Sequence, residues 1–498
     1  MKSTVLEPFL ILVVGATGDW AKKEIWPAIF AIFCNKEFAP DTKFLGIGRK
    51  VKKADGKTSV CRYAFQAHVR DALPQDANPE LVEKFMEHLY FYAANSDDAD
   101  SWRNLKKFSV EIEAPENLLF GLSTPTDLVV PTIRAIKTSG VLEPLTHRRR
   151  KRFLMLEKPY GTSHEECKTT FSEATETFGF DNVFPVDHYL VKQMVLELGA
   201  QRRNIPRFNC MYRSKRLSRV FIIADEADCL EHRHETYQSM RMGVFADMVL
   251  GHLLPLSVWM AMYERAIHPE VTASYVREMQ LDLVSGLKIK PLCWGQYTSG
   301  SSRGRNVRSY TDLGSEEYLK TPTFFACELS FSSGPLADVP FFIRTGKCLD
   351  KKHTEIRLVH KPLPSADADI SISDRFIMYL DDGISVRQNL LVKEDAVRNS
   401  KPEFGLSRVS PAIGSASSGA GQSFRPYEKL ITSAMNGNFK DFPSIGTVIA
   451  LYEKADEIWE EYEKKVAEDL KLSPSERRVL IPYSAGSSGP IVDGFPDY

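Results

Sequence analysis

The stretch that decides the fold is FLILVVGATG, residues 9–18, an unbroken apolar run that ends in a glycine turn. Glycines and charges follow the run, with no small-residue cleavage site, so the run predicts a buried parallel strand and not a secretory signal. An amphipathic stretch to Phe33 follows the turn, and Lys43–Ile47 is the next apolar run. This order of strand, glycine turn, helix and strand begins a nucleotide-binding type of fold.

The same alternation continues through the first third of the chain. Leu118–Leu122 and Phe153–Leu156 are further apolar runs, with helical patterns between them. Alternating strands and helices are typical of a doubly wound parallel sheet. We therefore predict an α/β Rossmann-type domain over residues 1–195.

The pattern changes near residue 200, where strands follow one another with turns between them. We expect strands at Val220–Ala224, Thr323–Phe331, Val339–Arg344, Glu355–Val359 and Arg375–Leu380. A long apolar helix is expected from about Met242 to Ala266. Together these elements predict an α+β domain over residues 196–498, built on a large, mostly antiparallel sheet.

Three segments complete this second part. Gly295–Arg305 and Ser407–Ser423 are rich in Ser and Gly, so we expect two flexible loops. A charged helix is expected from about Val448 to Leu470.

Composition limits the classes of partner. A chain of 498 residues is too long to fold around one ordinary hydrophobic core, so its length also favours two domains. Basic and acidic residues nearly cancel, 64 against 65, so no overall field draws nucleic acid or an anionic membrane to the protein. The basic run His147–Arg152 lacks interleaved aromatics, which favours a solvated loop over a nucleic-acid site. No apolar run reaches about 18 residues, so we expect no membrane span.

The 8 cysteines are scattered, with no CxxC pair and no spacing typical of a metal site. We expect reduced thiols, no bound metal and a cytoplasmic protein.

The glycine turn is a candidate cofactor site. Gly15, Thr17, Gly18 and Asp19 lie where a first strand meets a first helix, the place at which backbone N–H groups and the helix dipole bind a pyrophosphate. The spacing is GxxGxxA and not GxGxxG, so a plain tight turn is an alternative reading.

The second apolar run ends in Gly46-Ile47-Gly48-Arg49-Lys50. An acid is expected near this point when NAD is the cofactor, because it binds the ribose hydroxyls. Arg49 and Lys50 stand there instead, and a guanidinium can bind a 2′-phosphate, so NADP is favoured. A solvated basic turn is the alternative.

Several motifs then occur in order along nearly the whole chain. They are GATGDWAKKEIWP from Gly15, GIGRK from Gly46, LEKPYG from Leu156, VDHYLVKQ from Val186, FADMVLGHLLP from Phe245, VPFFIRTGKCL from Val339 and IPYSAGSSGP from Ile481. This series resembles the glucose-6-phosphate dehydrogenase family. The resemblance implies a dinucleotide-binding domain joined to a β+α domain, and NADP-dependent oxidation of glucose 6-phosphate to 6-phosphogluconolactone in the pentose phosphate pathway. We also expect a homodimer or homotetramer, because the large second sheet offers a face for symmetric association.

The resemblance assigns the catalytic base to His252 and its partner to Asp187. Histidine is matched to proton transfer near neutral pH, and a carboxylate on the far imidazole nitrogen fixes its tautomer. Without the resemblance, a histidine on an apolar helix is more often a core residue.

The resemblance also assigns the substrate contacts. His188, Tyr189 and Lys192 match the phosphate-binding positions, where several donors must converge on a dianion. Lys158 matches a lysine that contacts the substrate beside the nicotinamide. The further substrate positions are Glu226, Asp247, Lys347 and Lys352. Taken singly, such charged residues are more often found on a solvated surface.

Three residues depart from the family's pattern. Val191 and Gln193 replace Gly and Glu in VDHYLVKQ, and a β-branched residue disfavours a positive φ. Pro255 follows His252 within a predicted helix, where proline removes a hydrogen bond and clashes with the preceding turn. The alternative reading is therefore a catalytically weakened paralogue with a ligand-binding or regulatory role. The final motif is also degraded, so we expect no second, structural nucleotide.

Overall fold

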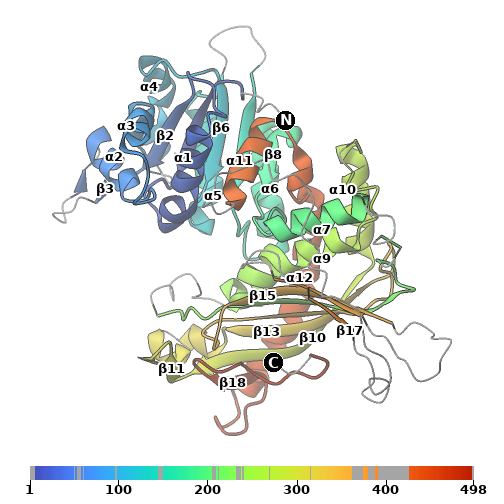
Figure 1. Ribbon diagram of the computed structural model, residues 1–498. Coiled ribbons are helices and arrows are strands. Elements are labelled where there is room, and N and C mark those ends of the chain that lie inside the picture. Colours follow the sequence, from blue (N-terminus) through green and yellow to red (C-terminus); the bar gives the residue numbers. More distant parts are fainter. Residues whose placement is uncertain are drawn as a thin grey trace. The chain divides into compact units, whose positions relative to one another are not determined.

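The computed structural model describes residues 6–49, 51–52, 58–59, 61–95, 98–143, 150–204, 209–210, 212–231, 237, 240–268, 270–314, 316–361, 374–379, 387–390 and 425–495. By their contacts, these residues divide into two units. Unit 1 comprises the described residues up to Val191 and those from Arg425 to Ile449, and unit 2 comprises the others. Figure 1 colours both units along the chain.

Unit 1 is built on a six-stranded sheet in the order β5-β2-β1-β6-β7-β8, with every pairing parallel. Its strands are β1 (Phe9–Val14), β2 (Lys43–Gly48), β5 (Leu89–Ala93), β6 (Asn117–Leu122), β7 (Arg152–Leu156) and β8 (Val183–Pro185). Every residue of β1 is buried, as expected of a strand inside a parallel sheet that is covered on both faces. The Rossmann-type fold predicted from FLILVVGATG is confirmed.

The helices of unit 1 pack in two groups: α1 contacts α3 and α11, whereas α5 contacts α6. The longer ones are α1 (Trp26–Cys34), α2 (Arg62–Arg70), α3 (Pro79–Glu87), α4 (Leu105–Glu111), α5 (Thr126–Thr138), α6 (His164–Phe178) and α11 (Pro426–Met435). A π-helical turn, η1 (Ala21–Ile25), leads into α1. Short elements complete the unit: β3 (Val51–Lys52), β4 (Thr58–Ser59), η2 (Ala99–Trp102), η3 (Phe180–Asn182) and η10 (Phe439–Asp441).

Helix α11 returns to unit 1 from late in the sequence. Tyr427, Leu430 and Ile431 are buried in the same hydrophobic cluster as Phe9 and Ile11 of β1. Figure 1 draws this helix in orange-red among the blue and green elements of unit 1. Unit 1 therefore combines two separate stretches of the chain, and a single boundary at residue 195 does not describe it.

Unit 2 is built on an eight-stranded sheet in the order β17-β16-β15-β9-β14-β13-β10-β18. Its strands are β9 (Leu217–Asp225), β10 (Leu287–Thr298), β13 (Phe324–Phe331), β14 (Phe341–Gly346), β15 (His353–His360), β16 (Asp374–Tyr379), β17 (Arg387–Leu390) and β18 (Leu480–Ser484). β9 pairs with β14 and β10 with β18 in parallel, and the other neighbours are antiparallel. The predicted α+β plan with a large, mostly antiparallel sheet is confirmed.

Helix α12 (Ile445–Asp469) covers part of this sheet with aromatic side chains. The Trp294 ring of β10 lies 4.2 Å from that of Tyr462 on α12 and 4.4 Å from that of Phe325 on β13, between ring centroids. Such close aromatic contacts add to the stabilisation from burial. The other helical elements of unit 2 are α7 (Gln193–Asn204), η5 (Met240–Met242), η6 (Phe245–Leu253), α9 (Leu254–Ala261), α10 (Ala273–Ser285), η7 (Tyr310–Leu313) and η8 (Glu316–Leu319).

One of the two expected loops is regular structure. Much of Gly295–Arg305 belongs to β10 and to the hairpin of β11 (Gly300–Ser302) and β12 (Arg305–Val307). The hairpin turn has positive φ at Arg303 and Gly304, +50° and +74°, and glycine adopts this conformation without strain. The expectation of a flexible loop was wrong for this segment, and Ser407–Ser423 lies outside the described residues.

A second correction concerns the cysteines. Cys229 and Cys348 form a disulfide across a sequence separation of 119 residues, whereas all eight were expected to be reduced. Scattered cysteines give no pairing signal in the sequence, because these two meet only when β9 and β14 lie side by side. Among the described residues, no helix is long and apolar enough to cross a membrane.

Candidate active site

The glycine turn lies at the carboxyl end of β1, next to the point where the strand order reverses between β1 and β6. Gly15 has φ +81°, and a Cβ built on it would lie 2.2 Å from the carbonyl oxygen of Ser123, just after β6. The amides of Gly15 and Ala16 both donate to the carbonyl of Ile47 at 3.0 and 3.1 Å. This position therefore requires glycine, because the turn passes close to the backbone of Ser123.

The later residues of the turn are more exposed than Ala16, which is fully buried. Gly18 donates its amide to the carbonyl of Gly15 at 2.9 Å, which closes the turn. Asp19 is exposed and pairs with Lys23 at 2.8 Å, one helical turn later. The Thr17 side chain lies beside Gly48, because a Cβ on Gly48 would be 3.7 Å from its hydroxyl oxygen. Thr17 and the end of β2 thus border one rim of the turn.

Arg49 is exposed directly after β2, whereas Lys50 lies outside the described residues. An exposed guanidinium at this strand end is available to an anionic group on the ribose. The glycine cradle, the helix that starts from it and Arg49 together fit a dinucleotide.

Glu157 and Lys158 follow β7, at the same edge of the sheet. The Tyr427 hydroxyl donates to the Glu157 carboxylate at 3.2 Å. Burial raises the pKa of Glu157 to about 7, against the opposing effects of Lys158 and of the Tyr427 hydrogen bond. Tyr160 lies two residues after Lys158, and its hydroxyl donates to the carbonyl of Val186 at 3.0 Å. This bond links the residues that follow β7 to those that follow β8.

The segment of Asp187, His188 and Tyr189 follows β8. Asp187 is 1% exposed, and its Oδ1 accepts the Tyr189 amide at 2.9 Å, which folds the segment into a tight turn. The His188 ring stacks on that of Tyr427, with centroids 5.8 Å apart and planes at 26°. Unit 1 therefore gathers the turn, Glu157–Lys158 and Asp187–Tyr189 at one edge of its sheet.

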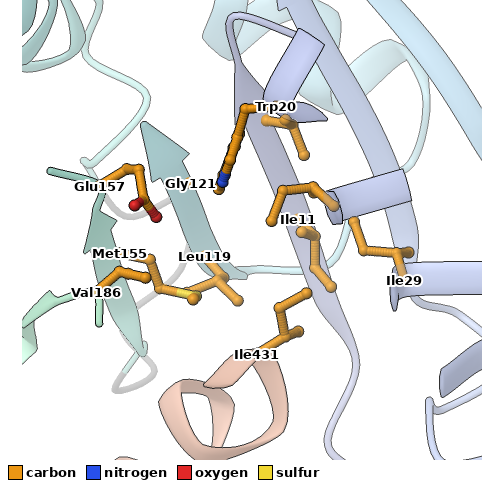
Figure 2. Close-up of a pocket in the computed structure, with 11 residues that line it drawn as sticks. Ile11, Trp20, Ile29, Leu119, Gly121, Met155, Glu157, Val186 and Ile431 are labelled. Carbon is orange, nitrogen blue, oxygen red and sulfur yellow. The ribbon is translucent and has the colours of Figure 1, made fainter. Parts of the chain in front are cut away.

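A small cavity of about 20 Å³ lies beside Glu157 (Figure 2), room for a single water molecule. Apolar side chains dominate its lining, which comprises Ile11, Val13, Trp20, Ile25, Ile29, Leu119, Gly121, Met155, Glu157, Val186 and Ile431. Figure 2 shows Glu157 on the β7 side, across from Ile29 of α1, with the Trp20 indole between them. This apolar surrounding is the physical reason for the raised pKa of Glu157.

Unit 2 holds a second polar group, formed around Lys347. The Lys347 ammonium, on a residue 5% exposed, donates to the carboxylates of Glu226 and of Asp247, the latter at 3.0 Å. Tyr237 donates to the same Asp247 oxygen, and its ring lies 5.5 Å from the ammonium. Burial opposes a charge on Lys347, but Tyr237, Asp247 and Glu226 together raise its pKa above the ordinary value.

His252 is 2% exposed within the π-helix η6. Pro255 does not interrupt that helix, because a new helix, α9, begins at Leu254 and places the proline in its first turn. The Leu254 amide donates to the Val249 carbonyl, the wider spacing of a π-helix. The proline therefore lies where π-helical spacing gives way to α-helical spacing, and the helix continues past it to Ala261.

Four further residues singled out in the sequence are Val191, Lys192, Gln193 and Lys352. Lys192 directly precedes α7, and its carbonyl accepts from the amides of Val195 and Leu196 at 2.9 and 3.1 Å. Lys352 is exposed just before β15. Gln193 is exposed and bonds Glu197 at 2.9 Å. Val191 is fully buried in the core of unit 1 and does not have a positive φ, so the replacement of Gly is accommodated.

Sequence reasoning missed Tyr237, Tyr427 and the hydrogen bond between Tyr427 and Glu157. Glu157 stands in the quoted motif LEKPYG, beside Lys158, so its proximity was visible. Neither tyrosine carries a signal in the sequence. Tyr427 reaches the site only through the return of α11, and Tyr237 lies 10 residues before Asp247.

Two family models match this chain, one in each part of the sequence. The family model for the NAD binding domain of glucose-6-phosphate dehydrogenase matches residues 12–197, and the model for its C-terminal domain matches residues 201–493.

Relatives of full length are similar to this chain. The glucose-6-phosphate 1-dehydrogenase of Rhizobium meliloti (strain 1021) is 26% identical over 496 residues, 97% of this chain and 95% of that protein. The enzyme of the same name from Bacillus subtilis (strain 168) is 25% identical over 518 residues, 98% of this chain and 96% of that protein.

Solved structures share the fold. A glucose-6-phosphate dehydrogenase in complex with glucose-6-phosphate has a TM-score of 0.74 at 21% identity, over 99% of this chain and 97% of that one. The glucose-6-phosphate 1-dehydrogenase of Mycobacterium avium has a TM-score of 0.69 at 18% identity, over 97% and 96% of the two chains.

Proposed function

The chain belongs to the glucose-6-phosphate dehydrogenase family, and from this premise we propose that it oxidises glucose 6-phosphate at C1 with NADP⁺ as the hydride acceptor. The product is 6-phosphogluconolactone, and the reaction is a step of the pentose phosphate pathway. A cytoplasmic homodimer or homotetramer remains the expected form.

The observation that carries the proposal is the group around Lys347. Glu226, Asp247 and Lys347, which the family resemblance assigns to substrate, converge within hydrogen-bonding distance in unit 2. The Lys347 side chain is 6% exposed, whereas those of Glu226 and Asp247 are each 31% exposed, so a ligand can reach the two carboxylates. The same arrangement offers charged acceptors and a donor, the groups that sugar hydroxyls require.

The cofactor assignment rests on the glycine turn and on Arg49. Gly15, Thr17, Gly18 and Asp19 would hold the pyrophosphate side of the dinucleotide, and Arg49 with Lys50 would bind the 2′-phosphate. When bound, the nicotinamide accepts the hydride from C1. Lys158, at the edge of the same sheet, would contact both the substrate and the cofactor.

The acid-base assignment follows the family match residue by residue. His252 would take the proton of the C1 hydroxyl as the hydride leaves, and Asp187 would fix its tautomer and stabilise the imidazolium. His188, Tyr189 and Lys192 would bind the phosphate. Fixing the phosphate and the reacting carbon separately converts binding energy into reactive geometry. Lys352 would add a further positive charge near the substrate.

Nicotinamide absorbance measures the proposed reaction directly. With glucose 6-phosphate, the purified chain is expected to reduce NADP⁺ faster than NAD⁺. His252→Asn should lower kcat by about 10²- to 10⁴-fold because it removes the base. His268→Asn, an exposed histidine in the same unit, is the matched control and should leave kcat unchanged.

Two results would count against these assignments. If calorimetry detects glucose 6-phosphate binding while no cofactor is reduced, the chain is a ligand-binding paralogue and not an enzyme. A faster reaction with NAD⁺ would remove the role given to Arg49.

A further inference from the structure

Tyr427 touches the three segments of unit 1 to which the proposed function assigns cofactor and substrate. Its hydroxyl accepts from Nε1 of Trp20, beside the glycine turn, at 2.9 Å. The same hydroxyl donates to the Glu157 carboxylate at 3.2 Å, and its ring stacks on His188. Tyr427 is 3% exposed, so these contacts are made inside the protein.

The direction of these hydrogen bonds is fixed by chemistry. An indole Nε1 is a donor only, so the Tyr427 oxygen must accept from Trp20. The hydroxyl proton is then free to point at Glu157. The resulting chain of donors runs from Trp20 through Tyr427 to the Glu157 carboxylate.

Glu157 directly precedes Lys158 at the end of β7. The positive charge of Lys158 favours the ionised form of the Glu157 carboxylate and opposes the rise in its pKa caused by burial. Tyr427 of α11 thus holds a carboxylate that interacts electrostatically with Lys158.

This arrangement is not explained by packing. The carboxylate lies beside an apolar cavity, where a hydrocarbon side chain would be stable without partners. Burial raises the pKa of Glu157 to about 7, so its charge changes within the working range of a histidine base. The charged or titratable groups that face it are Lys158, Tyr427 and Glu24.

We propose that Glu157 and Tyr427 are positioning residues, which hold Lys158 and His188 in the orientation that the reaction requires. This inference rests on the proposed function, because Lys158 and His188 matter only if they contact substrate. The ionised carboxylate accepts the Tyr427 hydrogen bond and attracts the Lys158 ammonium, whereas the neutral carboxyl does both more weakly.

The sign of the pH effect follows. Glu157 is neutral below a pH of about 7 and ionised above it, so its contribution to kcat/KM is present at high pH and lost as the pH falls. Glu157→Gln resembles the neutral carboxyl at every pH. The ratio of wild-type to variant kcat/KM should thus be on the order of 10 above this pH and shrink toward one below it. The base His252 is common to both proteins and cancels in the ratio.

Tyr427→Phe tests the second member of the pair while keeping the buried ring. The Tyr427 hydrogen bond lowers the pKa of Glu157, so the variant should lose its kcat/KM at a higher pH than the wild type. Infrared difference spectroscopy reads the same change without turnover, because a protonated carboxyl has its own C=O band. That band should be absent in Glu157→Gln and titrate at a higher pH in Tyr427→Phe.

Glu428→Gln is the matched control. Glu428 lies on the same helix, and burial raises its pKa to about 7 as well, but Arg425 and Glu37 face it and not Lys158. Its replacement should leave kcat/KM and the Glu157 band unchanged.

Each outcome decides one claim. If Glu157→Gln and Tyr427→Phe match the wild type in kcat/KM at all pH values, the positioning role is refuted and the proposed function stands. Equal losses in all three variants would also refute it, because disturbed packing of α11 would then be the cause. If the wild type reduces no cofactor, the proposed function fails, and the infrared titration still tests the Tyr427–Glu157 pair.

Discussion

Gly15 shows how one residue can be fixed by two independent constraints. Its φ of +81° lies in the left-handed region, and any Cβ would collide with the backbone carbonyl of Ser123 at 2.2 Å. Neither constraint comes from the spacing of glycines, which departs from GxGxxG. The identity of this residue is set by how closely β1 and β6 approach one another beyond their ends.

We predict that Gly15→Ala lowers the stability of unit 1 by about 1–3 kcal/mol and weakens NADP⁺ binding, because alanine is strained at this φ and its Cβ would push the backbone away from Ser123. Urea unfolding and calorimetry with NADP⁺ measure the two effects. Gly121→Ala is the control, because a Cβ there meets only the Leu12 carbonyl oxygen at 4.0 Å and its φ is not positive. Equal effects of both substitutions would contradict the assignment.

The proximity of some of the assigned residues was predictable where a motif carried them. The turn at Gly15, the Lys158 strand end and the Asp187 segment do share one edge of the unit 1 sheet. Lys347, Asp247 and Glu226 do meet in unit 2. Partners that arrive from distant sequence, such as Tyr427, were not predictable, because no local pattern records which helix will cover a sheet edge.

At the scale of elements, apolar runs located the strands well. β1 has the predicted bounds, and β7 and β15 differ from prediction by only a residue or two at their ends. β5, β8, β10, β17 and β18 were not predicted. β5 was missed although Leu89–Ala93 carries three consecutive aromatic residues, which favour a strand. The π-helix η6 could not be predicted, since its wider hydrogen bonding leaves no distinct apolar period.

The disulfide gives a testable property of the ends of β9 and β14. Cys229 lies three residues after Glu226, and Cys348 directly follows Lys347, so the bond ties together the two loops that hold these side chains. We predict that dithiothreitol lowers the melting temperature, because a bond that closes a long loop stabilises by about 2–4 kcal/mol.

Cys348→Ala supplies the comparison, since its melting temperature should not respond to the reductant. Peptide mapping of unreduced protein should join the peptides of Cys229 and Cys348. Recovery of both cysteines in alkylated form would show that the bond is absent.

At the scale of the whole molecule, the chain does not divide into a first and a second half. The core of unit 1 includes Leu430 and Ile431 of α11, side by side with residues of β1 and α1. The sequence predicted two domains of the right fold classes, but it could not predict that a helix from late in the chain belongs to the first unit. The apolar face of a helix indicates that the helix packs against another part of the protein, but it does not identify that part.

We predict that Leu430→Ala destabilises unit 1 by about 2–5 kcal/mol, because it opens a cavity at a fully buried position. Hydrogen exchange should show lost protection in β1 and α1, although these strands and helices lie roughly 400 residues earlier in the chain. Leu472→Ala is the control, since that side chain is 46% exposed. Loss of protection confined to α11 would contradict a shared core.

The return of α11 also sets an order of events during synthesis. Unit 1 cannot close its core when its last strand leaves the ribosome, because roughly 240 further residues must be made before α11 begins to emerge. At translation rates of about 5–20 residues per second, that interval is on the order of 10–50 s. Throughout it, the apolar surface that α11 will cover is open to chaperones and to other nascent chains.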